Sequence, residues 1–200
     1  MSGNTDPTPV RTVAVVVPFL NEEENLPLMY ERLSAAMAWQ PEQLQLILVD
    51  DGSTDGSARW VAELARRDSR VTLLRLSRNF GHQIAITAGM DHADTDAVII
   101  MDADLQDPPE VVPELLAKWR EGFEVVYAVR KSRAGESWAK KFLAASFYRV
   151  FHRMANIEVP MDAGDFRLID RKVVNAMREV RELHRFMGGL TGWLGVRPGA

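Results

Sequence analysis

The chain has 200 residues, of which 46% are hydrophobic and 26% are charged, and its formal net charge is −4. This composition is typical of one globular domain with a substantial core, and the acidic balance argues against nucleic acid as the main partner. The absence of cysteine excludes disulfides and thiolate metal sites, and no stretch approaches the ~18 apolar residues of a membrane span.

Hydrophobic periodicity predicts strands and helices in alternation after a polar tail. Residues 1–11 lack the apolar segment of a signal peptide, so we expect a disordered tail there. The expected strands are 12–20, 44–50, 70–76, 96–102 and 123–130, and the expected helices are 21–39, 57–68, 81–93, 109–122 and 137–155.

Residue types at the helix ends indicate where the helices begin and stop. In the first helix we expect Asn21 as the N-cap, followed by a first turn of three glutamates and an apolar stripe from Leu26 to Met37. Asp55 is the expected cap of the second helix. Gly122 is the expected C-terminal stop of the fourth.

Strands alternating with helices predict an α/β fold. We expect a Rossmann-like, mostly parallel sheet with helices on both faces, in a single domain from residue 12 to residue 200. Ligands of such sheets bind beyond the carboxyl ends of the strands. Four polar loops follow expected strands: "PFLNEEE", "VDDGSTD", "LSRNFGHQ" and "MDADLQD". The sequence therefore predicts one site where these loops converge.

Carboxylates are concentrated in "VIIMDADLQDPPE", where an apolar run ends in Asp102 and Asp104. Residues two apart in an extended segment project to the same side, so the two carboxylates can hold one hard divalent cation. Gln106 offers a further oxygen ligand. We therefore predict a Mg2+ or Mn2+ site at these three residues, open to phosphate oxygens. The alternative is a capped turn before the helix that starts near Pro109.

The loops after the first two strands carry further hydrogen-bond acceptors. Asp50 and Asp51 end a buried strand, and Asp51 could accept a hydrogen bond from a nucleotide base or from ribose hydroxyls. The alternative is a turn that leads into the next helix. Pro18 ends the first strand, so Asn21 and Glu22 are expected to face the same crevice.

Positive charge is concentrated between residues 130 and 153, where seven cations accompany one acid. Such a segment in an acidic protein suggests an anionic ligand or an anionic membrane surface. Arg130, Lys131 and Arg133 suit the binding of a phosphate. A solvated helix face is the alternative interpretation. The helix that follows could be interfacial or could be a core helix with extended cationic side chains.

Five stretches together resemble a known family. They are "VVVPFLNEEEN", "LVDDGSTD", "LSRNFGHQIAITAGMDHA", "DADLQDPPE" and "GDFRLIDRKVV". They are similar in order and spacing to family 2 glycosyltransferases of the GT-A fold. The most similar branch contains the polyprenyl-phosphate glycosyltransferases, such as dolichol-phosphate mannose synthases and bacterial undecaprenyl-phosphate glucosyltransferases.

The resemblance implies inverting transfer of a sugar from a nucleotide sugar to the phosphate of a membrane polyprenol, assisted by Mg2+ or Mn2+. It implies that Asp102, Asp104 and Gln106 carry the metal. It also implies a nucleotide-sugar pocket formed by Pro18, Asn21, Glu22, Asp50, Asp51, Arg78, Gly81, His82, Asp102 and Ala103. Phe80, Gly81 and His82 favour a UDP-sugar such as UDP-glucose, with GDP-mannose as the other possibility.

The same resemblance directs attention to the acceptor side. Asp165 and Arg167, expected in a loop within "MDAGDFRLIDRK", are the candidate catalytic residues. Asp165 would be a base or an acceptor-orienting group, and a structural ion pair with Arg167 is the alternative. Arg130, Lys131 and Arg133 would hold the lipid phosphate. The Gly-rich segment 184–195 resembles a segment near the acceptor, and a helix end followed by a turn is the alternative there.

Two further functions remain open at this point. The same fold could transfer sugar to a glycan hydroxyl, or the chain could bind nucleotide sugars without catalysis. Members of the branch commonly continue into C-terminal membrane helices, so we expect this chain to be a truncated, soluble part of a protein at the cytoplasmic face of the membrane, with a natural soluble relative as the alternative. A homo-oligomer is possible.

Overall fold

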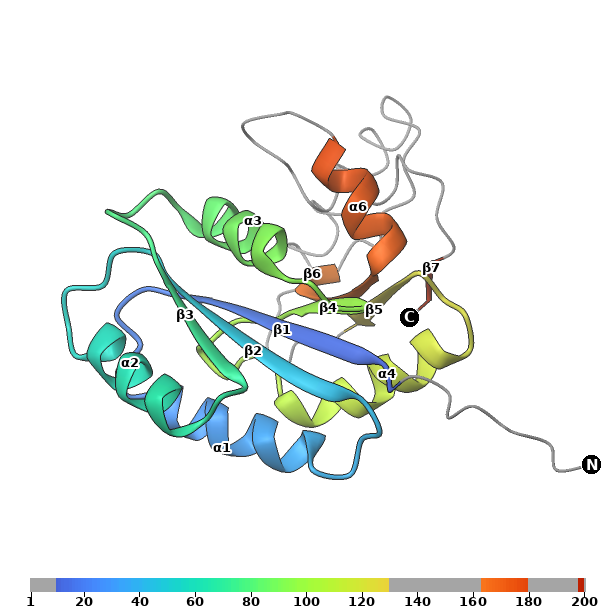
Figure 1. Cartoon of the computed structure of the whole chain (residues 1–200), viewed down its shortest axis with the longest axis horizontal. Coiled ribbons are helices and arrows are strands. Elements are labelled where there is room, and N and C mark those ends of the chain that lie inside the picture. The colour runs from blue at the N-terminus through green and yellow to red at the C-terminus, as the bar shows by residue number, and fades with distance from the viewer. Residues whose placement is uncertain (1–9, 130–162, 180–197, 200) are drawn as a thin grey trace, which may run out of the picture.

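The computed structural model describes residues 10–129, 163–179 and 198–199 (Figure 1). The strands are β1 (Thr12–Phe19), β2 (Gln43–Asp50), β3 (Val71–Arg75), β4 (Ala97–Ile100), β5 (Val125–Val129), β6 (Ala163–Asp170) and β7 (Pro198–Gly199). The helices are α1 (Leu26–Met37), α2 (Ser57–Arg67), α3 (His82–His92), α4 (Val112–Arg120) and α6 (Arg171–Glu179), with a 3-10 turn η1 (Pro109–Val111) before α4. Within this part of the chain, no helix has the length and apolar character needed to cross a membrane.

The strands form one sheet in the order β3-β2-β1-β4-β6-β5-β7. Strands β1 to β4 are parallel, β6 runs antiparallel to both β4 and β5, and β7 is parallel to β5. The expected α/β fold with a mostly parallel sheet is confirmed.

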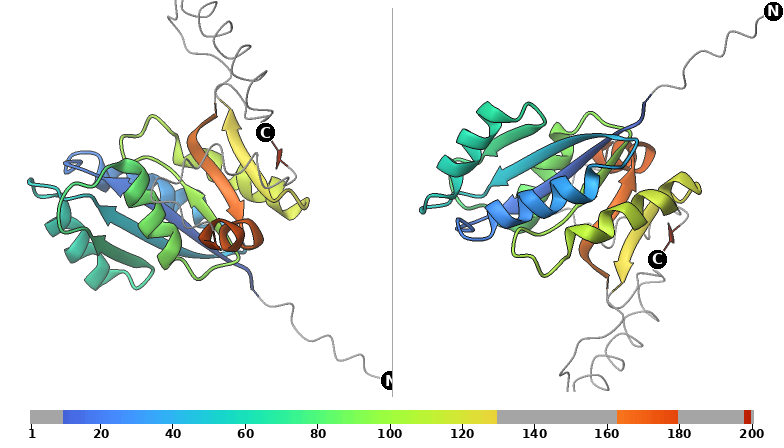
Figure 2. Two further views of the ribbon diagram at one scale, coloured as in Figure 1. Left: turned by 90° about the horizontal axis from the view of Figure 1, so that it is seen from above. Right: turned by 90° about the horizontal axis from the view of Figure 1, so that it is seen from below.

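Helices cover both faces of the sheet, as predicted (Figures 1 and 2). On one face, α1, α2 and α4 pack on residues that alternate along the strands, beginning with Val13, Val15 and Val17. On the other face, α3 and α6 pack on the intervening residues. Because β1 is buried from both sides, it reads as a continuous apolar run.

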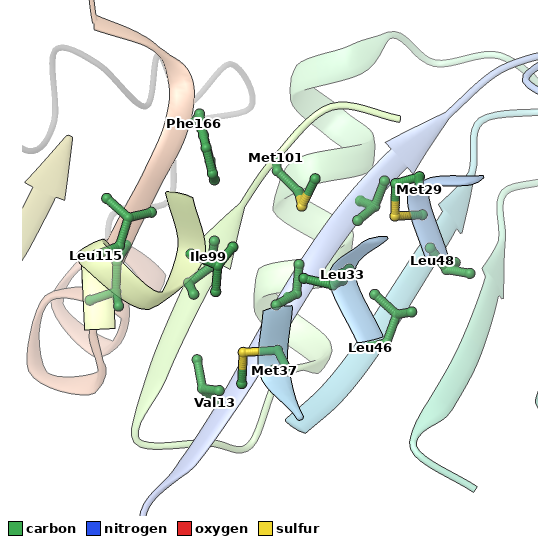
Figure 3. Packing of buried hydrophobic residues seen from close by; sticks show 14 of the residues in the cluster. Val13, Met29, Leu33, Met37, Leu46, Leu48, Ile99, Met101, Leu115 and Phe166 are labelled. Atoms are coloured by element: carbon green, nitrogen blue, oxygen red, sulfur yellow. The ribbon is translucent and has the colours of Figure 1, made fainter. Parts of the chain in front are cut away.

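The stripe predicted for the first helix is confirmed. Leu26, Met29, Leu33 and Met37 are all buried against the sheet. Figure 3 shows Met29 near Leu48 of β2 and Met37 near Val13 of β1. The expected start of this helix at Asn21 is wrong, because α1 begins at Leu26. The polar groups of Asn21 and Glu22 bond to the loop after β2 and to Ser57 at the start of α2 instead of capping a helix.

The loop expected around Asp165 and Arg167 is also wrong, because both residues lie in β6. Phe166 and Leu168 join one core cluster and Ile169 joins the other, which is the two-residue alternation of a strand. The charged residues interrupt this apolar pattern and hide it in the sequence.

Helix α3 is bonded at its C-terminal end by two arginines of α6. Arg178 Nη2 donates to the carbonyls of Met90 at 2.5 Å and Ala93 at 2.7 Å. Arg171 donates to the carbonyl of Ala93 and to Asp94. These bonds satisfy carbonyl groups that a helix end leaves without intrahelical partners.

Several predictions concern residues that the structure does not describe. The tail at 1–9 and the helix at 137–155 lie outside the described residues, as does the segment 184–195. Of the predicted tail, Val10 and Arg11 are described, and both are exposed.

Candidate active site

A cavity of about 310 Å3 opens where β1, β2 and β4 end. Its lining comprises Pro18, Phe19, Leu20, Glu22, Asp51, Asn79, Gly81, His82, Asp102, Ala103 and Asp104. Most of the residues predicted from the loops therefore meet in one place. Phe19, Leu20 and Asn79 were not predicted as site residues, although each belongs to a loop sequence that was.

The loops after β1 and β2 are bonded directly to one another. Asn21 has φ 57°, and its side-chain oxygen accepts from the backbone N–H of Thr54 at 2.8 Å. The N–H groups of Asn21 and Glu22 donate to the hydroxyls of Ser53 and Ser57. Asn21 thus shapes the wall and is not among the residues that line the cavity.

Asp50 is fully buried below the cavity and is also absent from its lining. One carboxylate oxygen accepts from the N–H of Ser53 at 2.7 Å, and the other lies 3.2 Å from Nε of Arg75 in an ion pair. Asp50 therefore holds the turn that begins the second loop.

Asp51 lines the cavity and organises the loop after β3. Its two oxygens accept from the N–H groups of Phe80 and Gly81, at 2.8 and 2.9 Å. A carboxylate oxygen has two lone pairs, so each of these oxygens can accept a further bond from a ligand. Gly52 allows the close approach, since a Cβ at its position would lie 2.7 Å from backbone atoms of Arg78 and Asn79.

Asp102 carries a buried oxygen that lacks a hydrogen-bond partner among the described residues. Its Oδ1 makes no hydrogen bond and lies 3.5 Å from Nε2 of His82. Burial raises the pKa of Asp102, and the negative charges of Asp107 and Asp104 raise it further against the opposing effect of His82. A buried carboxylate oxygen without a donor is costly, so this atom is suited to a cation.

The segment after Asp102 turns sharply. Leu105 has φ 62°, and the N–H of Gln106 donates to Oδ1 of Asp104 at 3.0 Å. Gln106 is exposed and does not line the cavity. In residues 10–129 and the two later described segments, no group of three or more histidines and acids is arranged to hold a metal by itself. Asp102 and Asp104 fit a cation that takes its other ligands from a bound diphosphate or water.

His82 at the start of α3 is joined to β6 through Asp165. Nε2 of His82 lies 3.1 Å from Oδ2 of Asp165, and Nε2 of Gln83 donates to the same oxygen at 3.2 Å. Arg167 donates to Oδ1 at 2.6 Å, and its side chain is only 2% exposed. The bond from His82 lowers the pKa of Asp165, and the charge of Arg167 lowers it further. The same hydrogen bond raises the pKa of His82.

The remaining predicted residues either do not line the cavity or lie outside the described residues. Arg78 is exposed, and its guanidinium lies 4.5 Å from the ring centroid of Phe80. Neither Asp165 nor Arg167 lines the cavity itself. Residues 130–133, the predicted phosphate-binding cations, lie outside the described residues.

The parallel sheet with one antiparallel strand, and the acidic cavity at its carboxyl edge, define an α/β protein of the GT-A fold. Residues 14–178 match the family described as "Glycosyl transferase family 2". The chain belongs to this family, as its sequence motifs indicated.

Curated relatives cover nearly the whole chain. It is 49% identical over 187 residues to "Uncharacterized glycosyltransferase YkcC" of Bacillus subtilis (strain 168), which covers 94% of this chain and 58% of the relative. It is 37% identical over 183 residues to "Bactoprenol glucosyl transferase" of Shigella phage SfV, covering 92% and 60%. The chain therefore spans about three fifths of the length of these relatives.

Solved structures share the fold at lower identity. A mannosyltransferase from Pyrobaculum calidifontis, in complex with GDP-Man and Mn2+, has a TM-score of 0.64 at 22% identity, over 98% of this chain and 56% of that one. Glucosyl-3-phosphoglycerate synthase from Mycobacterium tuberculosis, with Mn2+, UDP-glucose and phosphoglyceric acid, has a TM-score of 0.58 at 23% identity, over 82% and 57%.

Proposed function

We propose that this protein transfers a sugar, with inversion, from a nucleotide sugar to a polyprenyl phosphate, with the help of a divalent cation. The observation that carries the proposal is the acidic cavity in which Asp102 presents a buried, unbonded oxygen next to Asp104. The relatives named bactoprenol glucosyl transferase support the choice of acceptor.

Asp102 and Asp104, with Gln106 as a further ligand, are the proposed holders of Mg2+ or Mn2+. A bound cation would neutralise the diphosphate that leaves when the sugar is transferred. The solved structures of the mannosyltransferase with GDP-Man and Mn2+ and of glucosyl-3-phosphoglycerate synthase with Mn2+ and UDP-glucose support this assignment.

The nucleotide is proposed to lie along the loops after β1, β2 and β3. Asp51 and Glu22 would accept hydrogen bonds from the base or the ribose, and Pro18 and Gly81 would pack beside them. UDP-glucose is the favoured donor, because Phe80-Gly81-His82 and the glucosyl transferase relatives point in the same direction.

The surroundings of Asp165 favour a phosphate acceptor over a hydroxyl. Both oxygens of Asp165 already accept hydrogen bonds, and Arg167 holds it as an ion pair. A carboxylate with a lowered pKa is a weak base, whereas a glycan hydroxyl would have to lose its proton during transfer. A phosphate is already ionised near neutral pH. Arg130, Lys131 and Arg133 are proposed to bind it, and an anionic membrane surface is the proposed place of action.

Transfer can be tested with radiolabelled UDP-glucose, Mn2+ and undecaprenyl phosphate in detergent micelles. We expect label in the organic extract, and we expect Asp104→Asn to abolish it. Glu63→Gln, a matched loss of one acid at an exposed position of α2, should retain transfer. Label on a glycan but not on the lipid would refute the proposed acceptor. Binding of UDP-glucose without transfer to either would indicate a binding module.

A further inference from the structure

A second cavity lies at the edge of the sheet opposite to the candidate active site. It has a volume of about 680 Å3, and its lining includes residues that directly precede β1, β4 and β5. Trp119 and Phe123 bring aromatic rings to this lining, and the guanidinium of Arg11 lies 4.9 Å from the centroid of the Trp119 ring. Guanidinium groups and indole rings both stack on aromatic side chains, so the cavity is suited to a further aromatic ring.

Trp39 is the most exposed large hydrophobic residue in the described part of the chain. It is 92% exposed and lies between the end of α1 and the start of β2, so it belongs to the same edge of the sheet as the second cavity. It does not line that cavity in its own chain. Tryptophan is enriched in the centres of protein–protein interfaces, where it fills pockets of the partner. Its exposure therefore indicates a surface that another molecule covers.

Arg120 connects the turn that carries Trp39 to the wall of the second cavity. Arg120 lines the cavity, and its Nη2 donates to Oε1 of Gln40 at 2.8 Å and to Oε2 of Glu42 at 2.6 Å. The N–H of Gln40 donates to the carbonyl of Met37 at 3.1 Å. The turn is therefore held in place before any partner binds, which lowers the entropic cost of binding through Trp39.

From this arrangement we propose that the edge is an interface between two copies of the chain, in which Trp39 of each copy occupies the second cavity of the other, beside Arg11 and Trp119. A two-fold contact requires one patch to carry both complementary parts, and here the exposed indole and the cavity are neighbours. Among the described residues, the cavity lining holds four basic and three acidic residues, so two copies of this patch repel each other little. The candidate active site, where acids predominate, does not have this balance.

This interface leaves the candidate active site open in both copies, because that site lies where β1, β2 and β4 end. No residue of that site takes part, so the contact is independent of the proposed function. An inactive protein could still dimerise, and a monomeric protein could still transfer sugar.

Sedimentation equilibrium of the wild-type chain at about 1 to 200 µM tests for the dimer. We expect a reversible monomer–dimer equilibrium, and we expect Trp39→Ala to weaken it at least about thirtyfold, as for a hot-spot residue. Because Trp39 is exposed, this variant should keep its fold. Leu28→Ala removes a 47% exposed apolar side chain near the start of α1 and is the matched control, which should dimerise like the wild type. A wild-type chain that stays monomeric at every concentration, or a dimer that Trp39→Ala leaves unchanged, would overturn the proposal.

The place of Trp39 in the dimer can be read by NMR, because the chain has no cysteine and a spin label can be attached at one chosen position. Val10 lines the second cavity and is 57% exposed, so Val10→Cys carries a nitroxide there. The spin-labelled protein is mixed with 15N-labelled wild type, in which the indole signal of Trp39 is assigned by its loss in Trp39→Phe.

We expect strong broadening of the Trp39 indole signal by the nitroxide at Val10→Cys. We expect none from a nitroxide at Phe80→Cys, since Phe80 bonds to Asp51 at the opposite edge of the sheet. In a protein that dimerises, equal broadening from both labels, or no broadening from Val10→Cys, would show that Trp39 does not enter the cavity and would overturn the proposed contact.

Discussion

Two adjacent acidic residues at the end of β2 have different roles. Asp50 and Asp51 are adjacent, yet Asp50 is buried under a turn while Asp51 faces the cavity. Strand β2 ends at Asp50, whose carboxylate is held under the turn, and Asp51 is the first residue of the loop that lines the cavity. The sequence alone does not say which of the two acids lines the cavity, because the register of the strand relative to the crevice is set by the fold.

Asp102 is expected to lower the stability of the fold while it supports metal-dependent binding of the donor. Asp102→Asn removes the charge of a half-buried carboxylate whose buried Oδ1 has no hydrogen-bond partner among the described residues, so its melting temperature should equal or exceed that of the wild type. The same change should abolish Mn2+-dependent binding of UDP-glucose in calorimetry. A lower melting temperature together with preserved binding would contradict the assignment of Asp102 to the metal.

Gly52 is expected to tolerate no side chain. It has φ 85°, and an added Cβ would lie 2.7 Å from backbone atoms of Arg78 and Asn79. Gly122 has φ 95° with open space around its Cβ position, so Gly122→Ala isolates the backbone strain. We expect Gly52→Ala to lose about 1–3 kcal/mol more unfolding free energy than Gly122→Ala in urea titrations. Equal losses of unfolding free energy would show that the loop after β3 can shift to make room for the added Cβ atom.

At the scale of elements, the prediction of helices and strands succeeded where a segment has one apolar face or is apolar throughout. Strand β6 was missed because Asp165 and Arg167 place charge within a buried strand. Its antiparallel direction could not be derived, since it depends on residues 130–162, which separate it from β5. The bond between His82 and Asp165 joins residues 83 positions apart and has no local signal.

The contact between α1 and the end of α2 gives a dependence of stability on pH. The Arg70 guanidinium beside Asp68 holds the pKa of that carboxyl well below its usual range, and Tyr30 of α1 donates to it at 2.8 Å. A lowered pKa stabilises the fold above the ordinary carboxyl pKa of about 4, and this stabilisation is lost as the pH falls further.

We therefore expect the melting temperature to fall between about pH 5 and pH 3, and to fall less in Asp68→Asn, which should already be less stable at pH 7. Scanning calorimetry of both proteins across this range is the measurement. Parallel curves for the two proteins would show that other acids control the acid transition.

For the whole molecule, the fold and the place of the site were predictable because parallel strands bring their carboxyl ends to one edge. The sequence favoured UDP-glucose without deciding the nucleotide or the sugar, because the cavity offers acidic acceptors that several bases and sugars could use.

A thermal-shift panel of UDP-, GDP- and dTDP-sugars addresses this choice. A ligand at about 100 times its Kd should raise the stability of the native state by about 2.7 kcal/mol. We expect this increase with UDP-glucose and Mn2+, and its loss when EDTA removes the cation. A larger shift with GDP-mannose would identify the other donor, and a shift that survives EDTA would argue against a metal-bound diphosphate.

Helix α3 is fastened at both ends to a single unit of the chain, through Asp165 of β6 at its start and through Arg171 and Arg178 of α6 at its finish. Because these bonds join both ends of α3 to β6 and α6, a substitution in either element that displaces α3 would also change the position of His82 relative to Asp102.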